Sequence, residues 1–184
     1  MSGEATPERL RLFVACDLPV DVTDAVRRWQ EHELRQRRDL RLAPTLHLTL
    51  AFLGDVPATR VPDLEGVLGA ISWTPATCTF KGPLFLPPHG RRRVVALELD
   101  DPAGAVRRLQ AEVAEGLAAE GLYEPERRPW LPHVTVARYR RPGQPFSLQN
   151  VNIPGFGVVR MVLYSSHLER AGAVHAPIAD FPAS

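Results

Sequence analysis

A four-residue pattern of histidine, any residue, threonine and an apolar residue occurs twice in the chain. The first copy is HLTL at residues 47–50, and the second is HVTV at residues 133–136. Successive side chains of a β-strand point to opposite faces, so each His would share a face with its Thr. The apolar residues would anchor the other face in the core. Each copy would then present an imidazole and a hydroxyl about 6–7 Å apart along its strand.

Two such pairs facing each other suit displacement at phosphorus. One of His47 and His133 could take a proton from water while the other protonates the leaving oxygen, because an unperturbed pKa of ~6.5 makes both forms available near neutral pH. The hydroxyls of Thr49 and Thr135 could donate to phosphoryl oxygens, where negative charge grows in the transition state. A single His-x-Thr is more often structural than catalytic, so the hypothesis depends on the duplication.

Metal or cofactor chemistry has no signature in the sequence. Clustered ligands at HxxxH, HxH or DxD spacing do not occur, and neither does CxxC. We therefore expect no metal and no cofactor.

The two copies occupy corresponding places in two similar halves. The first half predicts strands at residues 11–18 and 46–53, a helix between them through Val22 and Val26, and a second helix over 61–71. Two extended segments follow, over 76–86 and 93–99. The second half predicts a helix over 106–117 and strands over 132–138 and 158–168. Residues 177–184 show no pattern. The mixture indicates an α+β or α/β fold that arose by duplication.

Composition restricts the class of protein further. The 184 residues fit one compact domain, and the net charge of +1 argues neither for nor against nucleic acid. No apolar run reaches the ~18–20 residues that cross a bilayer, and the N-terminal sequence lacks the apolar segment of a secretory signal. Cys16 and Cys78 are expected as reduced thiols. These features predict a cytoplasmic protein with no membrane contact.

Around the two histidines, the sequence resembles the 2H phosphoesterase superfamily, and within it the bacterial and archaeal RNA 2′,3′-cyclic phosphodiesterases, also called 2′-5′ RNA ligases. The resemblance is carried by two specific blocks, LHLTLAFLGDV at 46–56 and RPWLPHVTVAR at 128–138. RLFVACDLP at 11–19, the strand at 93–97 and LYSS at 163–166 are weaker matches. One departure is His175, which stands where the family commonly has Tyr.

The resemblance implies both fold and activity. The expected fold is α+β, a single bilobal domain over residues 1–184 with pseudo-twofold symmetry, antiparallel sheets lining a central cleft, and helices outside. His47 is expected as general acid and His133 as general base, with Thr49 and Thr135 on the phosphate. The expected reaction opens an RNA 2′,3′-cyclic phosphate to a 2′-phosphate, and some members join RNA halves, such as tRNA halves, through a 2′-5′ linkage. We expect a monomer.

Three further residues are candidates for substrate binding. Strand alternation puts Arg138 on the face opposite Thr135, from which it could reach the phosphate only if the strand ends or twists. Arg128 could reach RNA from the turn before the second copy, and Tyr139 could face the cleft and stack on a base. Solvated charge or core packing is the alternative for each. Phe52 is expected in the core, and His175 has no expected role.

Three other functions stay open on the sequence alone. The first is a 2H phosphodiesterase that acts on another small cyclic phosphate or nucleotide. The second is a metal-dependent phosphoesterase, which EDTA would inhibit. The third is a module that binds phosphorylated RNA without turning it over.

Overall fold

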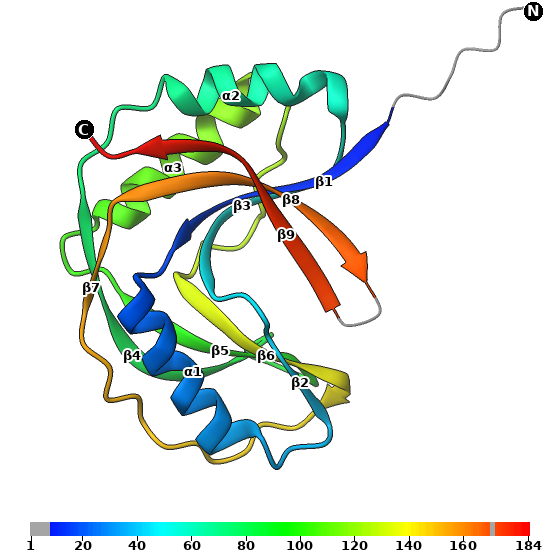
Figure 1. The fold of residues 1–184 in the computed structure, drawn as a ribbon, viewed down its shortest axis with the longest axis vertical. Helices are drawn as coiled ribbons and strands as arrows, with labels where there is room; N and C mark the ends of the chain where they lie inside the picture. The colour runs from blue at the N-terminus through cyan, green and yellow to red at the C-terminus, as the bar shows by residue number, and fades with distance from the viewer. Residues whose placement is uncertain (1–7, 170–171) are drawn as a thin grey trace, which may run out of the picture.

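The computed structural model describes residues 8–169 and 172–184, which form one curled antiparallel sheet with helices packed against it (Figure 1). The elements in chain order are β1 (Arg9–Asp17), α1 (Val20–Leu34), β2 (Leu40–Leu42), β3 (His47–Pro57), α2 (Val61–Gly69), β4 (Ala76–Leu86), β5 (Arg92–Asp100), α3 (Ala105–Ala119), β6 (His133–Gly143), β7 (Phe156–Val158), β8 (Arg160–Glu169) and β9 (Gly172–Pro182). The α+β prediction is confirmed.

The sheet is symmetric about its two central strands. Its order is β7-β4-β5-β6-β3-β1-β8-β9, with β2 pairing β6 off this path. Strand β3 is reached from β1 through α1, and β6 is reached from β5 through α3, so the two connections correspond. At the centre Leu48 pairs with Val134, which is the same position in the two motif copies. An antiparallel pair of equivalent residues is what a pseudo-twofold axis between the lobes requires.

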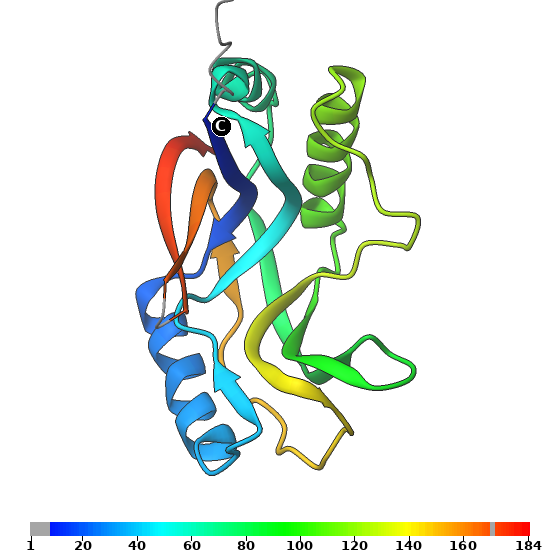
Figure 2. The ribbon, with the colours of Figure 1, turned by 90° about the vertical axis from the view of Figure 1, so that its right-hand side faces the viewer.

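Each connecting helix packs across the centre of the sheet. Helix α1 contacts β2 and β6, whereas α3 contacts β3, β4 and α2. Figure 2 shows α1 and α3 flanking the central strands from opposite sides of the view. The apolar motif residues Leu48, Leu50, Val134 and Val136 are buried in this core, as predicted. Burial of each such side chain is worth about 1.5–3 kcal/mol, and it fixes which face the histidines occupy.

Both central strands carry a β-bulge directly after the motif threonine. On β3 the register passes from Ala15↔Thr49 to Val14↔Ala51, which leaves Leu50 unpaired. On β6 it passes from Ala96↔Thr135 to Val95↔Ala137, which leaves Val136 unpaired. A bulge inserts one extra residue and therefore reverses the alternation of all side chains that follow.

A glutamine from each crossing helix bonds the carbonyl at the opposite bulge. Gln30 of α1 is buried, and its side-chain nitrogen donates to the carbonyl of Val136 at 2.7 Å. Gln110 of α3 donates to the carbonyl of Leu50 at 3.3 Å. The carbonyl of Val136 also accepts a bond from the backbone N–H of Ala43 at 2.9 Å. The two glutamine bonds pin each helix to the motif of the other lobe.

The structure also differs from the sequence prediction at several boundaries. Strand β3 continues past residue 53, where the predicted strand ended, to Pro57. Strands β2 and β9 were not predicted, and β9 covers most of the segment 177–184 that showed no pattern. Helix α3 begins after Gly104, and a carboxylate oxygen of Asp101 accepts a bond from the backbone N–H of Arg107 in its first turn.

Candidate active site

The motif residues of both lobes meet on one face of the central strands, which we call the motif face. His47, Thr49, His133 and Thr135 are all partly exposed there, while the residues between them are buried. The register through Leu48 and Val134 places His47 beside Thr135 and His133 beside Thr49. The two histidines are then diagonal neighbours, for which Cα atoms lie about 7–8 Å apart. A phosphoryl group between them could be approached by one imidazole from each side.

A hydrogen bond to the segment directly before β6 orients His133. Its Nδ1 lies 2.7 Å from the carbonyl oxygen of Leu131, and a carbonyl can only accept, so Nδ1 carries the proton. In the neutral ring Nε2 is then left as the acceptor. Nearby, the indole N–H of Trp130 donates to the carbonyl of Thr49 at 3.2 Å. This bond ties the segment before β6 to the motif strand of the other lobe.

His47 sits in a more apolar setting. Its ring centroid lies 5.0 Å from that of Phe13 and 5.5 Å from that of His175. Burial lowers the pKa of His47 to about 4, and the positive charges of His175, Arg138 and His133 act in the same direction. The carboxylate of Asp17 raises this pKa, but by less than burial lowers it. His47 is therefore neutral at pH 7 in the free protein.

Each motif histidine has a carboxylate directly across the sheet. Asp17 of β1 is paired with His47, and Glu98 of β5 is paired with His133. Asp17 accepts bonds from Arg160 at 2.8 Å and from the hydroxyl of Tyr164 at 2.7 Å. Glu98 accepts a bond from Lys81 at 2.7 Å. A cation therefore engages each carboxylate beside the motif histidines.

His175 was missed by the sequence prediction and lies at the site. It comes from β9, which reaches β3 only through β8 and β1. Its ring packs edge-on against both His47 and Phe13, 4.8 Å from the centroid of the latter. Burial lowers the pKa of His175, which favours the neutral form of this second imidazole beside His47. The only signal in the sequence was the departure from Tyr at this position, which carries no spatial information.

Two side chains lie on the motif face against the prediction from alternation. The bulge at Val136 turns Arg138 onto this face, where it is exposed and where its charge acts on His47. The equivalent bulge at Leu50 turns Phe52 out of the core, so that the ring is 49% exposed and lies 4.8 Å from the guanidinium carbon of Arg11. Placing Arg138 on the opposite face and Phe52 in the core was therefore wrong.

The other two candidates lie elsewhere. Tyr139 is only 9% exposed, and its hydroxyl donates to the carbonyl of Gln144 at 2.7 Å. The same bulge that exposes Arg138 buries this ring, so the expectation that Tyr139 faces the cleft is not met. Arg128 lies between α3 and β6, exposed to solvent and 3.7 Å from Glu126. A role for it in RNA binding stays a prediction.

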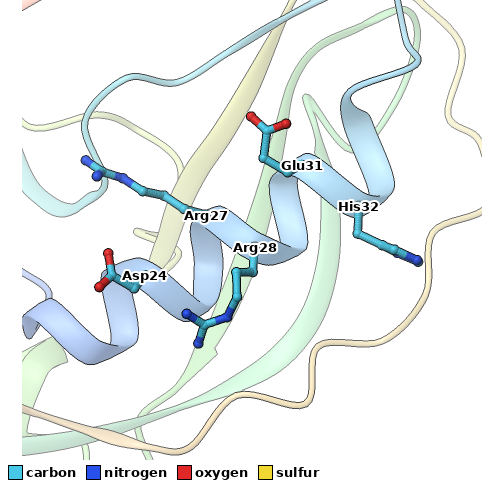
Figure 3. A pocket seen from close by; sticks show the side chains of 5 residues that line it. All are labelled: Asp24, Arg27, Arg28, Glu31 and His32. Carbon is cyan, nitrogen blue, oxygen red and sulfur yellow. The ribbon is translucent and has the colours of Figure 1, made fainter.

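A shallow pocket lies apart from the motif residues, along the outer side of α1 (Figure 3). Its lining comes from that single helix, and the side chains spread away from one another: Asp24, Arg27, Arg28, Glu31 and His32. One helix surface with mixed charges offers no converging groups for catalysis. Among residues 8–169 and 172–184, no set of three or more His, Cys, Asp or Glu side chains is grouped to hold a metal ion. Within the same ranges, no helix has the length and apolar character to span a membrane.

The chain is similar to proteins of known family and structure. The family model of the 2′-5′ RNA ligase superfamily matches residues 18–152 of this chain. The RNA 2′,3′-cyclic phosphodiesterase of Thermus thermophilus is 31% identical over 94% of this chain and 89% of the relative, and that of Escherichia coli is 29% identical over 93% and 95%. A crystal structure of E. coli LigT complexed with 3′-AMP superposes with a TM-score of 0.84 at 26% identity, covering 96% of this chain and 99% of that one.

Proposed function

Because the chain belongs to the 2′-5′ RNA ligase superfamily of two-histidine phosphoesterases, we propose that it opens the 2′,3′-cyclic phosphate at the 3′ end of an RNA and leaves a 2′-phosphate. The observation that carries the proposal is the convergence of both His-x-Thr pairs on one face through the pairing of Leu48 with Val134. Relatives named RNA 2′,3′-cyclic phosphodiesterase and the nucleotide-bound LigT structure support RNA ends as the substrate class.

In the proposed reaction, His133 is the general base. Its Nε2 takes a proton from a water molecule, whose oxygen attacks phosphorus in line with the 3′-oxygen of the ribose. The new P–O bond forms as the bond from phosphorus to the 3′-oxygen breaks. His47 gives a proton to the departing 3′-oxygen, and the phosphate stays on the 2′-oxygen. A 5′-hydroxyl of a second RNA in place of water would give a 2′-5′ linkage by the same steps, and tRNA halves provide such ends.

His47 must acquire its proton when substrate binds. In the free protein its pKa is about 4, mainly because of burial. A phosphodiester brings a negative charge against the ring, and an opposite charge at this range raises the pKa of an imidazole. A proton held only in the presence of the anion is also released readily to the leaving oxygen. Both motif copies come from one chain, so the site needs no second subunit, and we propose that the monomer is active.

A direct test incubates the purified protein, in EDTA, with a short RNA that ends in a 2′,3′-cyclic phosphate. We expect a 2′-phosphate product, because the proposed acid and base need no metal, and the position of the phosphate is read by mass spectrometry after digestion with enzymes specific for each isomer. A 3′-phosphate product would show that the 2′-oxygen, rather than the 3′-oxygen, is the leaving group. Turnover of small cyclic nucleotides alone would favour the other 2H substrates. Loss of activity in EDTA would contradict the metal-free mechanism.

Replacing Thr49 or Thr135 by Val should lower kcat by about 10- to 150-fold. Each hydroxyl is proposed to donate to a charged phosphoryl oxygen, a bond worth about 1.5–3 kcal/mol. Valine keeps the shape and the strand preference of threonine, so steady-state kinetics on a folded variant isolate the lost bond. Thr79→Val on β4, also a strand threonine and outside the motif pairs, is the matched control. An unchanged kcat in both motif variants would remove the threonines from the mechanism.

A further inference from the structure

A third histidine, His175 of β9, contacts the ring of His47 although β8 and β1 lie between their strands in the sheet. The two ring centroids are 5.5 Å apart, and the rings meet edge-on with an interplanar angle of 83°. Phe13 completes the cluster, with its centroid 5.0 Å from that of His47 and 4.8 Å from that of His175. Rings in mutual contact limit one another's rotation, so His175 and Phe13 together fix the orientation of the His47 ring.

In the described part of the chain, neither histidine of this contact is bonded to a carboxylate. The acid closest to them in the sheet is Asp17, and its two oxygens accept bonds from Tyr164 and Arg160. Nδ1 of His175 is buried and has no hydrogen-bond partner among the described residues. A proton on His175 would leave a charged N–H group there without an acceptor. His175 is therefore neutral near pH 7 and takes up a proton only in acidic solution, in agreement with the lowering of its pKa by burial.

A proton on His175 opposes a proton on His47. Like charges within about 4–6 Å disfavour each other, and the two rings lie in this range. The charge of His175 accordingly contributes to the lowering of the pKa of His47. Among the other charged groups around this ring, Arg138 and His133 of β6 act in the same direction, and Asp17 of β1 acts in the opposite one. His175 differs from Arg138 in that its charge changes with pH close to neutrality.

Resting on the proposed function, we propose that His175 is a positioning residue for the general acid. Its neutral ring holds the ring of His47 in place, and a proton on His175 prevents His47 from taking up the proton that the leaving oxygen requires. His175 is partly exposed, so it exchanges protons with solvent directly. In this scheme His175 takes no part in bond making or breaking, and it acts only through His47.

The first test compares wild type, His175→Phe and His175→Ala in the hydrolysis of a short RNA 2′,3′-cyclic phosphate from pH 7.5 to 4.5. Phenylalanine keeps a ring beside His47 but cannot be protonated, so kcat/KM at pH 7.5 should stay close to wild type. Alanine removes the ring, and kcat/KM at pH 7.5 should fall roughly tenfold, since small misplacements of reacting groups cost up to ~10²-fold. The ratio of His175→Phe to wild type should rise at least about threefold toward pH 4.5, because one pKa unit changes the protonated-to-neutral ratio tenfold.

Nuclear magnetic resonance tests the same coupling without turnover. The imidazole signals of His47 are followed in a pH titration in sulfate, a divalent anion that resembles a phosphoryl group. We expect the pKa of His47 to be lower in wild type than in His175→Phe, which carries no charge at position 175. In wild type alone, the signals of His47 should also shift as His175 takes up its proton. His167→Phe, a change at an exposed histidine of β8, should leave both the titration and the pH profile of kcat/KM as in wild type.

The outcomes separate the role of His175 from the reaction itself. A ratio of His175→Phe to wild type that stays constant from pH 7.5 to 4.5 would overturn the proposal. Equal kcat/KM for the Phe and Ala variants at pH 7.5 would also overturn it, because no ring would then be needed beside His47. If no protein hydrolyses the RNA, the proposed function fails, and the titration of His47 decides the coupling by itself. If His175→Phe does not fold, the response of His47 to His175 in wild type decides it.

Discussion

Replacing His47 or His133 by Ala is expected to lower kcat/KM on an RNA 2′,3′-cyclic phosphate at least 100-fold. Acid–base catalysis by a positioned side chain contributes about 10²–10⁴-fold, and each histidine is proposed to move one proton in the transition state. The measurement is steady-state hydrolysis of a short RNA by variants whose folding has been checked. His89→Ala, an exposed histidine in the β4–β5 loop, should keep wild-type activity. A loss below tenfold in either motif variant would contradict its assigned role.

The two histidines can be told apart by the leaving group. A substrate with sulfur in place of the 3′-bridging oxygen releases a thiolate, which needs no proton from an acid. We expect this substrate to restore most of the activity of His47→Ala and little of that of His133→Ala, because activation of water is still required. The reverse pattern would show that the acid and base roles are exchanged. The double variant should be little slower than the slower single variant, since groups that act as a unit are not additive.

The motif residues could be predicted from sequence because their signal is local and repeated. Alternation of apolar and polar residues placed His47 and Thr49 on one face and Leu48 on the other, and the structure has them so. The pairing of Leu48 with Val134 then follows from duplication, since two similar halves that share one sheet meet most simply at equivalent positions.

Residues beyond each threonine could not be placed by the same reasoning. A single unpaired residue reverses alternation, and the carbonyls at the Leu50 and Val136 bulges are bonded by glutamine side chains that lie far away in the sequence. The errors at Phe52, Arg138 and Tyr139 share this cause. His175 was missed for another reason: its place beside His47 is set by the pairing of β9 with β8, and β9 lacks a distinctive sequence pattern.

The free energy of unfolding should fall as pH drops from 6.5 to 4, and His47 should account for about 3 kcal/mol of the fall. Its pKa is 6.5 in the unfolded chain and about 4 in the folded protein. Above pH 6.5 both states hold it neutral, and it contributes no pH dependence. Between the two values only the unfolded state binds the proton, which favours unfolding. His175, whose pKa is also lowered by burial, adds to the same trend.

Urea unfolding of wild type and His47→Gln across this pH range, at constant ionic strength, measures the effect. The variant has no proton to bind at position 47. Its free energy of unfolding should therefore fall by about 3 kcal/mol less than that of wild type between pH 6.5 and 4. His89→Gln changes an exposed histidine and should keep the wild-type slope. If the free energy of unfolding changes with pH equally in wild type and His47→Gln, then His47 is not held neutral by burial.

Sulfate connects this stability measurement to the proposed mechanism, because it resembles a phosphoryl group and stays doubly charged from pH 6.5 to 4. If an anion between the motif histidines raises the pKa of His47, sulfate should stabilise wild type increasingly as the pH falls through this range. The general salting effect of sulfate acts equally on His47→Gln, so the difference between the two proteins isolates the site. A difference that does not grow toward low pH would mean that anion binding does not load His47 with its proton.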